Sequence, residues 1–289
     1  MKREYHSPTV SQSQQLNKAI DDSFFILSQE KKMYKVTQQN SKHLINWVGG
    51  KRILRKVIAE MVPDTISSYI EPFGGGAWVL FYKEKWAKNE VYNDIDKRLY
   101  NLFNVVKYHP EALQKELEFS VCSRSIFNRS LEDAGVTDIQ KAATFFYMIT
   151  RSYGGRGEHF GYCIKGSIKS SENLLSRIKA ISKRLDKVIV ENLDFENLIK
   201  KYDYENALFY CDPPYTVGQG YKTVKCEDFE HERLYNVLKN IKGKFILSYN
   251  DDEKIKKLYK DYNITAVARQ NSLNSGNIGK YKEVIIKNF

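Results

Sequence analysis

Hydrophobic positions from Asn46 onward follow two alternating patterns. Short apolar runs that end in turn residues are separated by longer amphipathic stretches. This alternation is typical of βαβ units, in which buried parallel strands are joined by helices that cover the sheet. It predicts an α/β fold in which the last two strands pair antiparallel, so that the sheet is mixed and mostly parallel. The expected strands are 68–71, 90–94, 187–191, 207–211, 245–249, 264–269 and 281–287, and the expected helices include 52–61, 78–86, 97–106, 139–150, 230–241 and 252–262.

Two segments depart from this pattern. Residues 1–40 are rich in Gln and Ser and contain one short apolar stretch, so we predict a polar N-terminal extension without a chemical role. Between residues 107 and 185 the strand rhythm stops and helical patterns replace it. The expected organisation is therefore an α/β domain formed by residues 41–106 and 186–289, with a helical insertion at 107–185.

The chain is strongly basic, with a net charge of +11 from 46 Lys and Arg against 35 Asp and Glu. This excess favours a polyanionic partner, because each Lys or Arg near a phosphate releases condensed counterions. The insertion holds much of the excess, since residues 151–185 contain eight Lys or Arg and two Asp or Glu. Arg and Gly are interleaved with aromatic residues there, which suits phosphate contact and base stacking. The candidate nucleic-acid contacts are Arg124, Arg151, Tyr153, Arg156, His159 and Tyr162.

Cysteine spacing and hydropathy argue against a metal site, export and a membrane span. The four cysteines show no CxxC spacing and the five histidines form no cluster, so no metal site is expected. The sequence shows no export signal and no run of about 18 apolar residues. We therefore expect a cytoplasmic, nucleoid-associated protein with reduced thiols and no membrane partner. The oligomeric state stays open, a monomer included.

The strongest chemical signal is Asp212-Pro213-Pro214-Tyr215, directly after the apolar run 207–211. A buried parallel strand would deliver this tetrad to the carboxyl edge of the sheet, where open α/β proteins bind ligands. The two prolines stiffen the loop, so a carboxylate and a carbonyl oxygen form a rigid acceptor pair beside the flat face of Tyr215. Accepting both N–H hydrogens of a conjugated amine aims its lone pair at an electrophile, which predicts group transfer to such an amine.

Two further motifs indicate a nucleoside cofactor. Glu71-Pro72-Phe73-Gly74-Gly75-Gly76 follows the first expected strand, and Asp94-Ile95-Asp96 ends the next. A glycine-rich turn lets a cofactor approach the backbone, and a carboxylate at that strand end suits ribose hydroxyls. The G-x-G-x-x-G spacing is absent, because Val79 stands at its sixth position, which favours S-adenosylmethionine over a dinucleotide. Trp47-Val48-Gly49-Gly50-Lys51, before an expected helix, suits the cofactor's carboxylate.

These motifs, in this order, resemble the Dam-type, D12-class DNA adenine-N6 methyltransferases. The likeness runs from about Leu44 to Asn288 and is carried by WxGGK at 47–51, EPFxGxx at 71–77, NDID at 93–96 and DPPY at 212–215, with a looser match at 279–285. It implies a Rossmann-like S-adenosylmethionine-dependent methyltransferase fold with a seven-stranded sheet. It also implies methylation of N6 of an adenine flipped out of double-stranded DNA, with residues 107–185 as the target-recognition insertion.

The resemblance also assigns residues to roles. Asp212, Pro213, Pro214 and Tyr215 would be catalytic and would grip the adenine. The residues that would surround S-adenosylmethionine are Trp47, Gly50, Lys51, Glu71, Pro72, Phe73, Gly74, Gly75, Gly76, Asp94, Ile95 and Asp212.

Two positions depart from the family pattern. Ala77 replaces the second glycine after Phe73, which alters the close approach at that turn. Residues 151–157 lack the Asn of family members that read GATC, so the target sequence and any restriction-enzyme partner stay open. The chemistry of the tetrad also permits methylation of cytosine N4 in DNA or adenine N6 in RNA. A catalytically inactive DNA-binding module with the same fold is the alternative from another class.

Overall fold

The computed structural model describes residues 43–118, 120–161, 171–216, 229–270 and 280–289. The predicted N-terminal extension and Tyr162 lie outside these residues. The strands are β1 (Ser68–Glu71), β2 (Asn89–Asn93), β3 (Val188–Glu191), β4 (Ala207–Cys211), β5 (Lys244–Asn250), β6 (Asn263–Gln270) and β7 (Lys280–Lys287). The helices are α2 (Arg55–Met61), α3 (Lys97–Tyr108), α4 (Pro110–Glu118), α5 (Arg124–Glu132), α6 (Asp138–Arg151), α7 (Ser171–Leu185), α8 (Phe195–Tyr202), α9 (His231–Lys239) and α10 (Glu253–Leu258), with short 3-10 helices η1 (Leu80–Tyr82) and η2 (Tyr153–Gly155).

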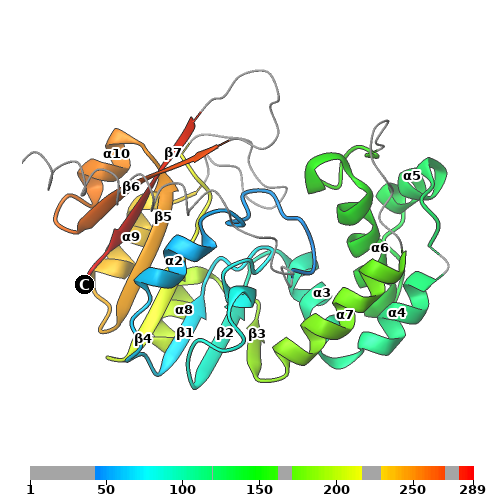
Figure 1. Cartoon of the computed structure of the whole chain (residues 1–289), viewed down its shortest axis with the longest axis horizontal. Helices are drawn as coiled ribbons and strands as arrows, with labels where there is room; N and C mark the ends of the chain where they lie inside the picture. Colours follow the sequence, from blue (N-terminus) through cyan, green and yellow to red (C-terminus); the bar gives the residue numbers. More distant parts are fainter. Residues whose placement is uncertain (1–42, 119, 162–170, 217–228, 271–279) are drawn as a thin grey trace, which may run out of the picture. The chain divides into compact units, whose positions relative to one another are not determined.

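The strands form one sheet of seven, in the order β3-β2-β1-β4-β5-β7-β6 (Figure 1). Strands β1 to β5 pair in parallel, and β7 runs antiparallel to both of its neighbours. From β1 the chain builds the sheet outward through β2 and β3 on one side, and it then returns to add β4 and β5 on the other side. The loops after β1 and β4 therefore diverge and leave a crevice at the carboxyl edge of the sheet. Open α/β sheets bind their ligands at such a switch point. The predicted mixed, mostly parallel sheet is confirmed.

Helices cover both faces of the sheet because neighbouring strand residues point to opposite sides. On β1, Tyr69 packs in the core beneath α2, α3, α6 and α7, whereas Ile70 packs in the core beneath α8, α9 and α10. On β4, Leu208 packs in the same core as Tyr69, and Phe209 packs in the same core as Ile70. Burial on both faces explains the continuous apolar sequence of β4.

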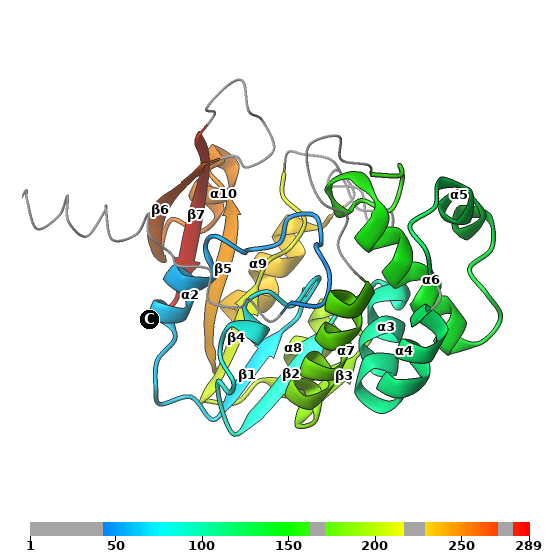
Figure 2. The ribbon, with the colours of Figure 1, turned by 45° about the vertical axis from the view of Figure 1, so that its right-hand side comes forward.

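Helices α3 to α7 gather beside the β3 edge of the sheet (Figure 2). All five lie between β2 and β3 in the sequence, and α4 to α7 fall within residues 107–185, where the helical insertion was expected. An ion pair ties this group to the sheet, because the Arg184 guanidinium of α7 lies 2.7 Å from Glu90 of β2 and both side chains are buried. None of the helices in the described residues is long and apolar enough to cross a membrane.

The predicted helix over 78–86 was wrong, since only the short 3-10 helix η1 forms there. Its carbonyl groups have other partners. The carbonyl of Leu80 accepts hydrogen bonds from the Trp86 indole at 3.0 Å and from Arg184 at 3.1 Å, and Arg184 also donates to the carbonyl of Lys83 at 3.0 Å. Side chains thus satisfy groups that helix amides would otherwise occupy. Helix α2 likewise begins at Arg55, three residues later than expected.

Candidate active site

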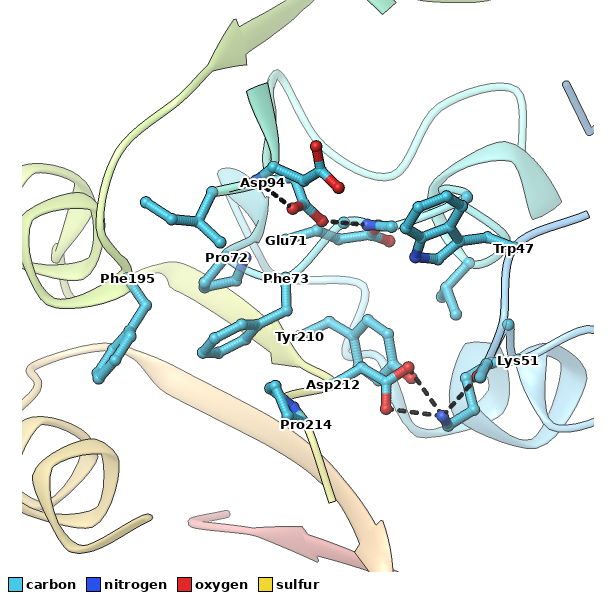
Figure 3. Close-up of a pocket in the computed structure, with 18 of the residues that line it drawn as sticks. Trp47, Lys51, Glu71, Pro72, Phe73, Asp94, Phe195, Tyr210, Asp212 and Pro214 are labelled. Carbon is cyan, nitrogen blue, oxygen red and sulfur yellow. Dashed lines mark hydrogen bonds and ion pairs between the residues drawn. The ribbon is translucent and has the colours of Figure 1, made fainter. Parts of the chain in front are cut away.

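A cavity of about 240 Å³ lies at the carboxyl ends of β1, β2 and β4. All twelve residues predicted to surround the cofactor line it, from Trp47 to Asp212. Figure 3 shows Lys51 beside Asp212 and Pro214 at one end of the group of lining residues, Asp94 and Trp47 at the other end, and Phe73 and Phe195 along one side. Tertiary structure therefore brings the four motifs together around one space. Pro213 and Tyr215 lie next to Pro214 but do not line the cavity.

The Asp212 carboxylate is held from two directions. The ammonium of Lys51 lies 2.7 Å from Oδ1 and 2.8 Å from Oδ2, and the buried Ser248 hydroxyl of β5 donates to Oδ1 at 2.9 Å. Tyr215 is fixed at its far end, where its hydroxyl donates to Glu283 Oε2 of β7 at 3.0 Å. Burial raises the pKa of Tyr215 above its ordinary value, so the ring stays neutral. The loop after β4 therefore presents a fixed carboxylate and a fixed aromatic ring.

The glycine turn after β1 is tied to the end of β2. Asp94 Oδ2 accepts a hydrogen bond from the Gly75 amide and Oδ1 accepts one from the Asp96 amide, both at 2.8 Å. Burial raises the pKa of Asp94 to about 6. Gly75 has φ +50 and Ala77 has φ +53, the left-handed region that favours glycine. This explains why the family pattern has a glycine where this chain has Ala77.

Glu71 is buried at the end of β1, where its Oε1 accepts a hydrogen bond from the Tyr69 hydroxyl at 2.8 Å. Burial, and to a smaller extent the charge of Asp212, raises the pKa of Glu71 from 4.5 to about 8. The folded protein therefore holds this carboxyl protonated near neutral pH, in the wall of the cavity.

This shift predicts a pH dependence of stability. The pKa of Glu71 is higher in the folded protein than in the unfolded chain, so protonation of Glu71 stabilises the fold. This stabilisation is complete below pH 4.5 and is lost as the pH rises through about 8. The free energy of unfolding should fall by up to about 1.4 kcal/mol per pH unit for this one proton. Glu71→Gln should remove that slope between pH 6 and 8, which urea unfolding of both proteins would measure. Equal slopes in the two proteins would contradict the assignment.

Several cavity residues were not anticipated from the sequence. Phe73 and Phe195 lie 5.5 Å apart between ring centroids, and Phe229 lies 5.7 Å from each, forming an aromatic wall. Asp194 and Phe195 follow β3 as Asp94 follows β2, so the position after a strand end could have identified them. Phe229 and Arg233 reach the cavity from near α9 and carry no such signal. The unanticipated lining residues include Trp78, Leu193, Asp194, Phe195, Tyr210, Phe229, Glu230 and Arg233.

The candidate nucleic-acid contacts gather around a loop at 152–160, which is closed by a β-bridge between Ser152 and Phe160. Tyr153 is 64% exposed there, and Arg156 and His159 are also exposed. Arg124 of α5 is exposed and places its guanidinium 5.1 Å from the ring centroid of Phe160, so it joins the same surface.

Arg151 does not belong to this surface. Its side chain is only 7% exposed, because the last turn of α6 directs it into the protein. A buried guanidinium is not available to a phosphate, so the expectation for Arg151 needs correction.

The backbone of the loop depends on its glycines. Gly154 and Gly155 have φ +64 and +74. At Gly155 a side chain would also collide with the carbonyl oxygen of Asn46, so the loop packs directly against the segment that leads to Trp47.

The fold and the cavity define an α/β protein with a cavity at a switch point of its sheet, beside a DPPY loop. The chain belongs to the family of D12 class N6 adenine-specific DNA methyltransferases, whose model matches residues 47–273. It is therefore an enzyme, a site-specific DNA methyltransferase that modifies adenine at N6. Family and fold imply S-adenosylmethionine as methyl donor and duplex DNA as substrate. The predicted family, activity and fold class are confirmed.

Three curated relatives are similar to this chain over most of their own length. Type II methyltransferase M1.LlaDCHI of Lactococcus lactis is 26% identical, over 86% of this chain and 96% of its own. Type II methyltransferase M.MjaIII of Methanocaldococcus jannaschii is 29% identical, over 81% and 93% of the two chains. Type II methyltransferase M.CviBI of Paramecium bursaria Chlorella virus NC1A is 24% identical, over 86% and 100%.

Proposed function

We propose that the enzyme methylates an adenine flipped out of duplex DNA, with the base held by Asp212, Pro213, Pro214 and Tyr215 at the mouth of the β1–β4 cavity. The observation that carries this proposal is the position of the Asp212 carboxylate, which lies in the cavity wall directly after β4. A fixed carboxylate oxygen accepts one N–H of the exocyclic amine, and the proline carbonyl offers the second acceptor. The ring of Tyr215 provides a stacking face.

We propose that the cavity itself holds S-adenosylmethionine. Its composition suits that molecule. The Phe73, Phe195 and Phe229 wall fits a purine ring, and Asp94 retains lone pairs for ribose hydroxyls. A Cβ at Gly50 or Gly74 would collide with Trp78 or Tyr92, and a Cβ at Gly76 would lie 3.0 Å from Trp47, so the glycines let these turns pack closely against the aromatic rings. When bound, S-adenosylmethionine supplies a sulfonium methyl group as the electrophile.

We propose that residues 107–185 form the target-recognition insertion and that residues 41–106 and 186–289 form the catalytic domain, preceded by the extension at 1–40. The exposed side chains of Arg124, Tyr153, Arg156 and His159 support a DNA-facing role for the loop at 152–160. Base flipping costs a few kcal/mol of unstacking, which such phosphate and groove contacts offset. Since the substrate is DNA, we propose the nucleoid as the place of action.

The test is sequencing of DNA and RNA from cells that express the protein, with detection of N6-methyladenine and N4-methylcytosine, which reports the base, the kind of nucleic acid and the sequence context together. Methylated adenine within one short sequence in the wild type, and none with Asp212→Ala, is the expected result. Methylated cytosine N4, methylation of RNA alone, or no methylation would each favour one of the alternatives and contradict the proposal.

Arg156→Ala should weaken DNA binding and reduce the slope of log K against log salt by about 1, because one phosphate contact is lost. Fluorescence anisotropy at several salt concentrations measures this slope. Lys200→Ala is the matched control, since its side chain is 68% exposed on α8, on the other face of the sheet. Cofactor affinity should stay unchanged in both variants. A slope equal to that of the wild type would remove Arg156 from the DNA contacts.

A further inference from the structure

The ammonium of Lys51 lies deep in the candidate active site, with a side chain only 4% exposed. It contacts both Asp212 oxygens, at 2.7 and 2.8 Å, and donates to the carbonyl oxygen of Gly49 at 3.0 Å. The same ammonium lies 4.8 Å from the ring centroid of Tyr215. An ammonium has three N–H donors, so these contacts use all of them. Figure 3 shows Lys51 reaching toward the Asp212 carboxylate from the segment that also carries Trp47.

These contacts coincide with those proposed for the substrate. The exocyclic amine of adenine is expected to donate to the Asp212 carboxylate while its ring stacks on Tyr215. Lys51 already donates N–H groups to that carboxylate and places its charge near that ring, where a cation is attracted. The base and the lysine therefore compete for the same acceptor and the same aromatic face.

On the basis of the proposed function, we infer that Lys51 occupies the site of the substrate's amino group in the absence of DNA and that the flipped adenine must displace it. A partly buried carboxylate without a partner is costly, so the lysine stabilises Asp212 while no base is bound. It also closes the acceptor site to other amines. Only a base delivered with the binding energy of a complete DNA complex then gains entry.

The segment that carries Lys51 contacts the proposed DNA-binding region. Trp47 packs edge-on against Phe145 of α6 with 5.9 Å between ring centroids, and the carbonyl of Asn46 lies against Gly155 of the loop. DNA that engages the loop at 152–160 therefore acts on the same segment from which the lysine must be withdrawn. This contact gives displacement of Lys51 a physical connection to recognition of the target.

The test compares two DNA duplexes that differ only in the amino group of the target base. Both contain the sequence that the wild type methylates, one with adenine at the target and the other with purine, in which hydrogen replaces the amino group. Fluorescence anisotropy without cofactor gives the ratio of the two dissociation constants. Changes in phosphate contact or in base pairing cancel when this ratio is compared between protein variants.

Lys51→Met should increase the preference for the adenine duplex. If Lys51 occupies the carboxylate nine-tenths of the time, its removal raises the ratio about tenfold. Lys56→Met is the matched control, because this lysine of α2 is 50% exposed and its loss should leave the ratio unchanged. Lys51→Gln keeps N–H donors without the charge, and should also raise the ratio if the Met variant does not fold.

A ratio equal to that of the wild type in the folded Lys51 variants would overturn the inference. That result would leave the proposed function intact, because the duplex is chosen for methylation by the wild type. Absence of any methylated duplex would instead refute the proposed function before the ratio is measured.

Discussion

Asp212→Asn should reduce single-turnover methyl transfer about 10²–10³-fold or more, because the variant loses the charged acceptor that orients the amine. Transfer of a radioactive methyl group to duplex DNA measures this loss. The dissociation constant for DNA should change little, since the insertion supplies the proposed DNA contacts. Asn retains an oxygen that can accept the hydrogen bond from Ser248, which lies 2.9 Å from Asp212, so the loop after β4 should keep its position.

The control for this variant is Asp261→Asn, which removes an exposed carboxylate after α10. Its transfer rate should equal that of the wild type. Asp212→Ala should be at least as impaired as Asp212→Asn. Full turnover by either Asp212 variant would show that the carboxylate does not act on the amine, and the proposed role of the tetrad would fail.

Arg184→Met should destabilise the fold by about 3–5 kcal/mol, because it leaves the buried Glu90 carboxylate without its charge partner. The two side chains are 7% and 4% exposed, and Arg184 also donates to the carbonyl groups of Leu80 and Lys83. Urea unfolding measures the loss. The destabilisation should exceed that of a typical surface substitution several times over, because a surface change usually costs within about 0.5 kcal/mol.

The double variant Glu90→Gln, Arg184→Met tests the cause of this effect. Gln at position 90 keeps an oxygen for the backbone amide of Trp86, which donates to Glu90 Oε1 at 2.9 Å, and leaves no buried charge. The double variant should be more stable than Arg184→Met alone. If it were equally unstable, lost packing rather than an unpaired charge would be the reason.

Several features were predictable because the signal is local. Strands β1 and β4 occur at the predicted residues. The signal is clearest at β4, whose five residues are all apolar and buried, as expected of a strand covered on both faces. The motifs after β1, β2 and β4 were predictable as one site because parallel strands end at the same edge. The same reasoning applied to the end of β3 would have predicted Asp194 and Phe195 as residues of the site.

Other features depend on partners that are distant in the sequence. The segment 78–86 forms only a short 3-10 helix because Arg184 and Trp86 bind its carbonyl groups, and Arg151 faces inward because of how α6 packs. The sequence assigned Lys51 to the carboxylate of the cofactor, whereas the structure places it on Asp212, 161 positions away.

The fold class, the family and the twelve motif residues around the cavity could be predicted from the sequence, because hydrophobic periodicity and short motifs are local properties of the chain. Only the tertiary structure decided which charged groups meet. Ion pairs such as Lys51 with Asp212 and Arg184 with Glu90 form between side chains that are brought together by sheet order and helix packing. No local pattern encodes those distances, because they are set by the burial of apolar surface throughout the domain.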